Sequence, residues 1–142
     1  MVNNHQERLQ GHMKMRVWQN ADRLDVMIQD LIKHVPKFQY KLIQQIDRAT
    51  NSVLANFVEG YYSCSTREYI RFARYSKRSL GEVVEHLTGF YRRKYIDQIE
   101  YNKAMTLCWR TMYLIDRLLL SLEKKLASSP KTITRTFPVF MP

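Results

Sequence analysis

Residues 101–126, YNKAMTLCWRTMYLIDRLLLSLEKKL, decide the fold of this chain. Their apolar positions recur at alternating steps of four and three, the spacing of one apolar face on an α-helix. Asp97 and Glu100 have the spacing of a capping box just ahead, and Pro130 follows Ser128 and Ser129 at the far end. We therefore predict one long helix after Asp97, with this apolar stripe: Tyr101, Met105, Cys108, Met112, Ile115, Leu119, Leu122 and Leu126.

Three similar stripes precede it. The first predicts a helix over about residues 14–34 that Pro36 stops: Val17, Ala21, Leu24, Ile28, Leu31 and Val35. The second predicts a helix to about Glu59, closed by a left-handed Gly60: Leu42, Ile46, Ala49, Val53 and Phe57. The third follows a capping-box pattern at Ser65 and Glu68: Tyr69, Phe72, Ser76, Leu80, Val83, Leu87 and Phe90. Four such helices with short links predict an all-α, up-down-up-down antiparallel four-helix bundle.

The domain organisation follows from these boundaries. We expect a flexible N-terminus at 1–13, the bundle at 14–127 and a short extended C-terminal tail at 128–142. A hydrophobic content of 45% excludes disorder of the whole chain. Apolar runs of three or four residues are too short to span a membrane, and two cysteines without metal or redox spacing fit a reducing compartment. We therefore expect a cytoplasmic protein without membrane contact.

No catalytic, cofactor or metal motif occurs in the sequence, so we expect neither an enzyme nor a bound cofactor or metal. The four histidines are interpreted as surface or structural residues, and Cys108 as a small core residue. Asn56 and Glu59 are unusual polar residues at the inner end of the second helix. We expect them to bond backbone groups there rather than to perform acid–base chemistry.

Positive charge is the clearest functional signal, because the net charge is +10 and much of it lies on the third helix. Its arginines recur at steps of four, three and four, with Lys77 beside them, Tyr75 nearby and a second cluster at the end of the helix. Like charges at this spacing repel unless a polyanion neutralises them. The candidate nucleic-acid-binding residues are Arg67, Arg71, Arg74, Lys77, Arg78, Arg92, Arg93 and Lys94. The alternative is a solvated basic face that only maintains solubility.

The last helix carries apolar residues outside its stripe as well, so a second side of it should be covered. Self-association through Trp109, Tyr113, Leu114 and Leu118 is the simplest explanation. A C-terminal tail folded back over that side, with Phe137, Val139, Phe140 and Met141, is the alternative. Leu107 and Leu120 also lie outside the stripe.

The middle of the chain resembles the bacterial four-helix bundle proteins first noticed in intervening sequences of large-subunit ribosomal RNA genes. The resemblance covers about residues 15–125, and its most specific part is Asn-x-x-Glu-Gly at residues 56–60. It rests also on these residues: Val17, Trp18, Leu42, Gln45, Ile46, Arg48, Ala49, Ser52, Val53, Ser65, Glu68, Tyr69, Phe72, Ser79, Leu80, Glu82, Tyr95 and Ile96. The family usually has Ala-x-Gly-Ser where this chain has Ser76-Lys77-Arg78-Ser79, which puts a close helix approach in doubt.

The resemblance implies a homopentamer and kinship with the accessory variability proteins of diversity-generating retroelements, which bind a reverse transcriptase and nucleic acid. Two functions are therefore open. One is a non-catalytic pentameric scaffold that binds RNA, DNA or their hybrid and serves a reverse transcriptase. The other is a protein-interaction module without nucleic-acid binding.

Overall fold

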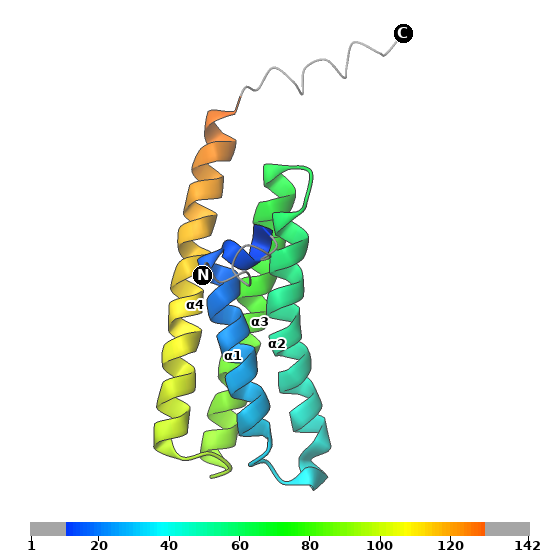
Figure 1. The fold of residues 1–142 in the computed structure, drawn as a ribbon, viewed down its shortest axis with the longest axis vertical. Helices are drawn as coiled ribbons and strands as arrows, with labels where there is room; N and C mark the ends of the chain where they lie inside the picture. The colour runs from blue at the N-terminus through cyan, green and yellow to red at the C-terminus, as the bar shows by residue number, and fades with distance from the viewer. Residues whose placement is uncertain (1–10, 130–142) are drawn as a thin grey trace, which may run out of the picture.

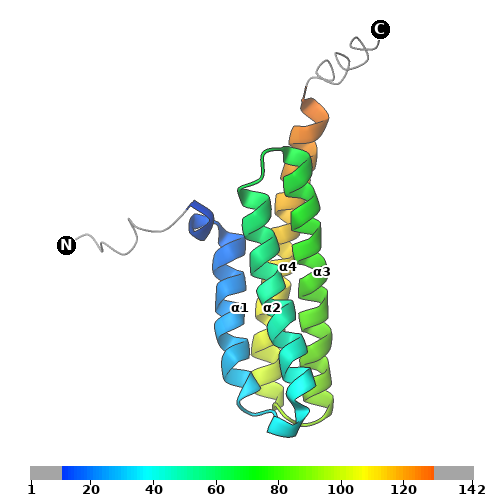
Figure 2. The ribbon, with the colours of Figure 1, turned by 90° about the vertical axis from the view of Figure 1, so that its right-hand side faces the viewer.

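The computed structural model describes residues 11–129, and these form helices joined by short links (Figure 1). Short 3-10 helices, η1 (Gly11–Lys14) and η2 (Lys37–Gln39), precede α1 (Arg16–Ile32) and α2 (Tyr40–Tyr61), and α3 (Thr66–Arg92) and α4 (Gln98–Ser128) follow. Neighbouring helices run in opposite directions, and α4 extends past the α2–α3 link (Figures 1 and 2). The predicted all-α four-helix bundle is confirmed.

All six residues of the first predicted stripe are buried, five of them in α1 and Val35 in the turn that follows it. The helix ends earlier than expected. Lys33, His34 and Val35 each donate a backbone bond to the residue three positions before, which tightens the last turn ahead of Pro36.

Gly60 does not close α2, so that part of the prediction is wrong. No glycine among residues 11–129 has a positive φ, and the helix continues through Gly60 to Tyr61. A Cβ on Gly60 would lie 2.9 Å from Cβ of Phe72 and 3.2 Å from Cδ1 of Tyr69. The glycine is needed because α3 approaches α2 closely at this point.

Helix α3 differs from the prediction in its first two turns. Ile70 and Ala73 are buried there, whereas Tyr69 and Phe72 are half-buried. The two aromatic rings flank the apolar stripe and pack toward α2 beside Gly60. The rest of the predicted stripe, from Ser76 to Phe90, is buried.

The predicted capping boxes differ in outcome. Asp97 and Glu100 form a complete box at the start of α4, with bonds of 2.7 and 3.0 Å. Ser65 caps α3 by accepting a 3.1 Å bond from the backbone N–H of Glu68. The carboxylate of Glu68 pairs with Arg71 instead of bonding back to Ser65.

Helix α4 buries Cys108, Ile115, Leu119 and Leu122 of its predicted stripe, and the other four stripe residues pack half-buried against the core. Leu107, expected outside the stripe, is buried, as are Ala104 and Thr111. The buried face therefore includes the neighbouring row 104, 107 and 111. Trp109, Tyr113 and Leu120 remain 55%, 62% and 52% exposed.

The expected domain boundaries overlap the described residues only in part. Residues 11–13 of the expected flexible N-terminus lie in η1, where the His12 ring accepts or donates a 3.0 Å bond with the Tyr62 hydroxyl. Residues 1–10 and 130–142, including the tail that was considered as a cover for α4, lie outside the described residues.

Candidate nucleic-acid interface

The basic face of α3, defined as Arg67, Arg71, Arg74, Lys77 and Arg78, is built by helical spacing. The four arginines are exposed on the side of α3 away from the buried Ser76, Leu80 and Leu87, and the half-buried Lys77 lies between that side and the core. Ser65 caps the start of α3. Helical spacing then places all five cations beside one another along successive turns of α3.

Three of these cations already have acidic partners. Nη2 of Arg71 lies 2.9 Å from Oε2 of Glu68. Two partners come from α4, because Arg74 pairs with Glu123 at 3.1 Å and Lys77 with Asp116 at 2.7 Å. The charge pattern of α3 alone does not reveal Glu123 and Asp116, because both acids lie on α4. All three pairs are exposed, so each contributes about 0–1 kcal/mol to stability and can exchange for a phosphate contact.

Arg67 and Arg78 form no ion pair within 4 Å with any residue in 11–129. The guanidinium of Arg78 lies over the Tyr75 ring, 5.3 Å from its centroid. Arg78 occupies the position of the usual family glycine and is exposed, so no close approach within the subunit is lost there. Ser76 instead makes a direct α3–α2 bond, donating to the carbonyl of Val53 at 2.6 Å.

A groove of about 710 Å³ runs between α3 and α4 beside this face. Its rim carries Arg74, Lys77 and Arg78 together with the two carboxylates of α4. Met112, Leu119 and Leu120 supply its apolar walls. The basic face therefore borders a mixed apolar and charged groove rather than open solvent alone.

The second cluster, Arg92, Arg93 and Lys94, is separate from the basic face. Arg92 lies about 21 Å farther along the helix axis than Arg78, at the opposite end of α3. Arg92 has one weak pair, at 3.8 Å with Glu85. Nη1 of Arg93 folds back over Gly89, where it would lie 2.7 Å from a Cβ. The eight predicted residues thus form two separate surfaces.

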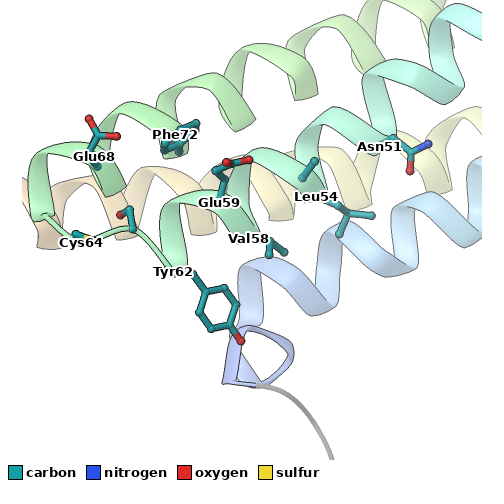
Figure 3. Close-up of a pocket in the computed structure, with 10 residues that line it drawn as sticks. Asn51, Leu54, Val58, Glu59, Tyr62, Cys64, Glu68 and Phe72 are labelled. Atoms are coloured by element: carbon teal, nitrogen blue, oxygen red, sulfur yellow. The ribbon is translucent and has the colours of Figure 1, made fainter.

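A second groove, of about 860 Å³, lies on the other side of α3, against α2 (Figure 3). Leu54, Val58 and Phe72 line it, and Glu59 and Glu68 stand at its edge. Asn56 donates to a backbone carbonyl as predicted, at 2.9 Å, but that of Ser52 inside α2 and not one at the helix end. Glu59 makes no side-chain hydrogen bond with residues 11–129, so the same prediction fails for it.

The four residues predicted to form an oligomer interface divide into two pairs. Trp109 and Tyr113 are exposed on the outside of α4. Leu114 and Leu118 are half-buried and pack against the core of their own subunit. The available apolar surface is therefore narrower than the sequence indicated.

Two buried titratable groups lie outside these surfaces. Burial raises the pKa of the Cys108 thiol to about 12. Burial, then the nearby Tyr61, raises the pKa of Tyr69 to about 12, and the Tyr69 hydroxyl has no hydrogen-bond partner among the described residues. Within residues 11–129, no three His, Cys, Asp or Glu side chains lie close enough to hold a metal ion.

No helix in residues 11–129 combines the length and apolar character that crossing a membrane requires. The fold and surface define an all-α four-helix bundle protein with a basic helix face. Residues 13–117, about three quarters of the chain, match the family described as 23S rRNA-intervening sequence protein, and the chain belongs to that family.

A crystal structure of similar fold is that of a protein of unknown function from the S23 ribosomal protein family of Bacteroides thetaiotaomicron VPI-5482. It shares 21% sequence identity at a TM-score of 0.67, over 72% of this chain and 97% of that one. At this identity the likeness shows the fold alone. No curated protein matches the chain.

Proposed function

We propose that this protein is a non-catalytic, homopentameric scaffold that binds nucleic acid through the basic face of α3. In this role it serves a reverse transcriptase as an accessory protein of a diversity-generating retroelement. The observation that carries the proposal is a net charge of +10 with four exposed arginines on one helix side.

Phosphate is the ligand that this face fits best. Arg67 and Arg78 form no ion pair within residues 11–129, and the exposed pairs of Arg71 and Arg74 are weak enough to rearrange. No base-reading motif occurs, so binding depends on backbone charge and has little sequence preference. Five copies of a modest surface in one assembly raise the affinity through multivalency.

Assembly is supported by the exposed aromatic rings of Trp109 and Tyr113 on α4. Removing such rings from water is favourable, and large aromatic residues are enriched at protein interfaces. The closed pentamer and the reverse transcriptase partner rest on the family resemblance.

The test changes the four arginines of the basic face to glutamine and measures affinity for a labelled RNA hairpin and an RNA–DNA hybrid. Affinity should fall alike for unrelated sequences. The slope of log affinity against log salt should become shallower by about 0.7–0.9 for each lost phosphate contact. A matched variant removes the same charge from other exposed arginines and should bind nearly as the parent does: Arg16, Arg23, Arg48 and Arg117.

A parent-like affinity and slope in the first variant would exclude the basic face of α3. Absence of parent binding at about 50 mM salt would exclude the nucleic-acid function altogether.

The second candidate function is a protein-interaction module without nucleic-acid binding. It is favoured by the pairs of Arg74 with Glu123 and of Lys77 with Asp116, which neutralise part of the basic face within the subunit.

A further inference from the structure

The two links at one end of the bundle are held together by side-chain contacts. The α1–α2 and α3–α4 links lie at the same end, opposite the α2–α3 link (Figures 1 and 2). Nε2 of Gln39 donates to the Tyr95 hydroxyl at 2.9 Å, and Nδ1 of His34 lies 2.8 Å from Oε2 of Glu100. These contacts between the links fix their relative position.

This end carries an ordered aromatic stack. The rings of Tyr91 and Tyr101 are parallel within 9°, with centroids 4.6 Å apart. The Tyr101 hydroxyl shares a 3.1 Å bond with Oγ1 of Thr88, which holds the inner ring. Tyr91 is 36% exposed, so its ring is available for a third aromatic group.

A groove of about 670 Å³ adjoins Tyr91, and Arg92, Lys94 and Tyr95 also line it. The volume lies within the range of small-molecule sites, roughly 300–1,000 Å³, and accommodates a nucleotide.

The carboxylates that line the same groove are already engaged. Asp97 accepts the backbone N–H of Glu100 at 2.7 Å. Glu100 accepts the backbone N–H of Asp97 at 3.0 Å and contacts His34 with its other oxygen. Lys94 has no ion pair within the described residues, and Arg92 has only its 3.8 Å contact. Neither Arg92 nor Lys94 is therefore held by these two carboxylates, which keep their negative charge at the edge of the groove.

Lys94 also occupies an unfavourable backbone conformation. Its φ of 62° places it in the left-handed region at the end of α3, where glycine is the usual residue. A lysine at this position carries a conformational cost, and that cost is consistent with a use for its side chain.

We propose that this end of the bundle binds single-stranded nucleic acid, with one base stacked on Tyr91 in the groove and its phosphates contacting Arg92 and Lys94. An unpaired base has a free face for such stacking, whereas the bases of a duplex are already stacked on one another. Phe38, 74% exposed in η2, and Tyr40, 57% exposed at the start of α2, offer further stacking surfaces. The inference rests on the proposed nucleic-acid function but not on the basic face of α3.

The experiment compares the full-length parent with Tyr91→Leu, using a labelled oligouridine of about 20 nucleotides and a duplex of the same length. Single-strand affinity should fall about 5- to 100-fold, the loss expected for one stacked base, while duplex affinity stays within about twofold. Lys94→Gly should also weaken single-strand binding, and it should not destabilise the fold because glycine suits a φ of 62°.

Matched controls lie at the other end of the bundle. Tyr62→Leu changes a tyrosine that is 56% exposed, and Lys124→Gln changes an exposed lysine of α4. Both should bind the oligouridine as the parent does.

The outcomes separate the two proposals. Unchanged single-strand binding in Tyr91→Leu and Lys94→Gly overturns this site, even if the glutamine variant of the α3 face loses affinity. A second result would support this site and refute the α3 interface. In it, Tyr91→Leu loses oligouridine affinity, while the glutamine variant of the α3 face keeps the parent's affinity for the hairpin and the hybrid. If the parent does not bind the oligouridine, the single-strand assignment is overturned. This holds whether or not the parent binds vesicles of phosphatidylserine, an anionic lipid.

Discussion

At the scale of single residues, Gly60 and Gly81 play opposite roles. Gly60 lies where a Cβ would be 2.9 Å from Cβ of Phe72, whereas nothing lies within 4 Å of a Cβ on Gly81. The first glycine permits close packing of α2 on α3, and the second only weakens a helix.

Gly60→Ala should therefore lower the free energy of unfolding by about 1–3 kcal/mol, because the extra methyl group forces α2 and α3 apart. Gly81→Ala should raise it by about 1 kcal/mol through helix propensity. Chemical denaturation of both variants measures the difference. Equal effects of the same sign would show that the close approach at Gly60 is not limiting.

The buried hydroxyl of Tyr69 gives a second residue-scale prediction. It has no hydrogen-bond partner among the described residues, so Tyr69→Phe should stabilise the fold by about 1 kcal/mol near neutral pH. The pKa of Tyr69 is raised from 10.0 to about 12, so the unfolded chain loses this proton first as the pH rises. The Tyr69 hydroxyl therefore destabilises the fold by a constant amount below about pH 10 and by a growing amount as the pH rises toward 12.

Unfolding free energies of the parent and Tyr69→Phe should thus diverge further between pH 10 and 12, with the parent losing more. Parallel curves over that range would mean that the hydroxyl is not desolvated in the folded state.

At the scale of helices, two acidic residues of α4 neutralise part of the positive charge of α3. Asp116 and Glu123 hold Lys77 and Arg74 at 2.7 and 3.1 Å. Changing both acids to their amides releases two cations while disturbing only exposed pairs. The free energy of unfolding should change by less than about 1 kcal/mol per pair.

Nucleic-acid affinity of this Asp116→Asn, Glu123→Gln variant should rise about 2- to 30-fold at low salt, since roughly 0.2–1 kcal/mol per pair no longer competes. Asp22→Asn with Glu82→Gln makes the same change of net charge away from any ion pair within residues 11–129 and serves as the control. An equal rise in the control would assign the effect to net charge alone.

The helices themselves were largely predictable from the sequence, because periodicity reports which face of a helix is apolar. All six residues of the first stripe are buried, and the Asp97–Glu100 box forms as expected. Periodicity does not report what lies across a helix interface. It therefore missed the role of Gly60 in packing and the burial of Ile70 in place of Tyr69.

The candidate sites were less predictable, since they depend on residues far apart in the chain. The pairing of Arg74 with Glu123 joins two helices, and the bond from Gln39 to Tyr95 joins two links. The charge pattern along the sequence identified the arginines of α3 but not their acidic partners on α4. It also identified Arg92, Arg93 and Lys94 as a second cluster at the end of the helix, but not their distance from the first.

At the scale of the whole molecule, the exposed apolar residues are concentrated unequally. Trp109 and Tyr113 are one helical turn apart on α4. A groove of about 240 Å³ beside Tyr113 lies between α4 and α1. Val26 on α1 and Phe38 in the α1–α2 link are also exposed. Trp109 and Tyr113 lie on the side of α4 that has surplus apolar surface.

Native mass spectrometry of the parent should therefore give a closed oligomer, most simply five times the subunit mass of 17.1 kDa. Trp109→Gln with Tyr113→Gln should shift the distribution toward single subunits, because the buried aromatic area that favours association is removed. Helical content by circular dichroism should stay unchanged, since the two rings are 55% and 62% exposed in the subunit. The control, Val26→Gln with Phe38→Gln, should leave the oligomer intact. A parent that stays monomeric at micromolar concentration would refute the assembly, and dissociation in the control alone would move the interface away from α4.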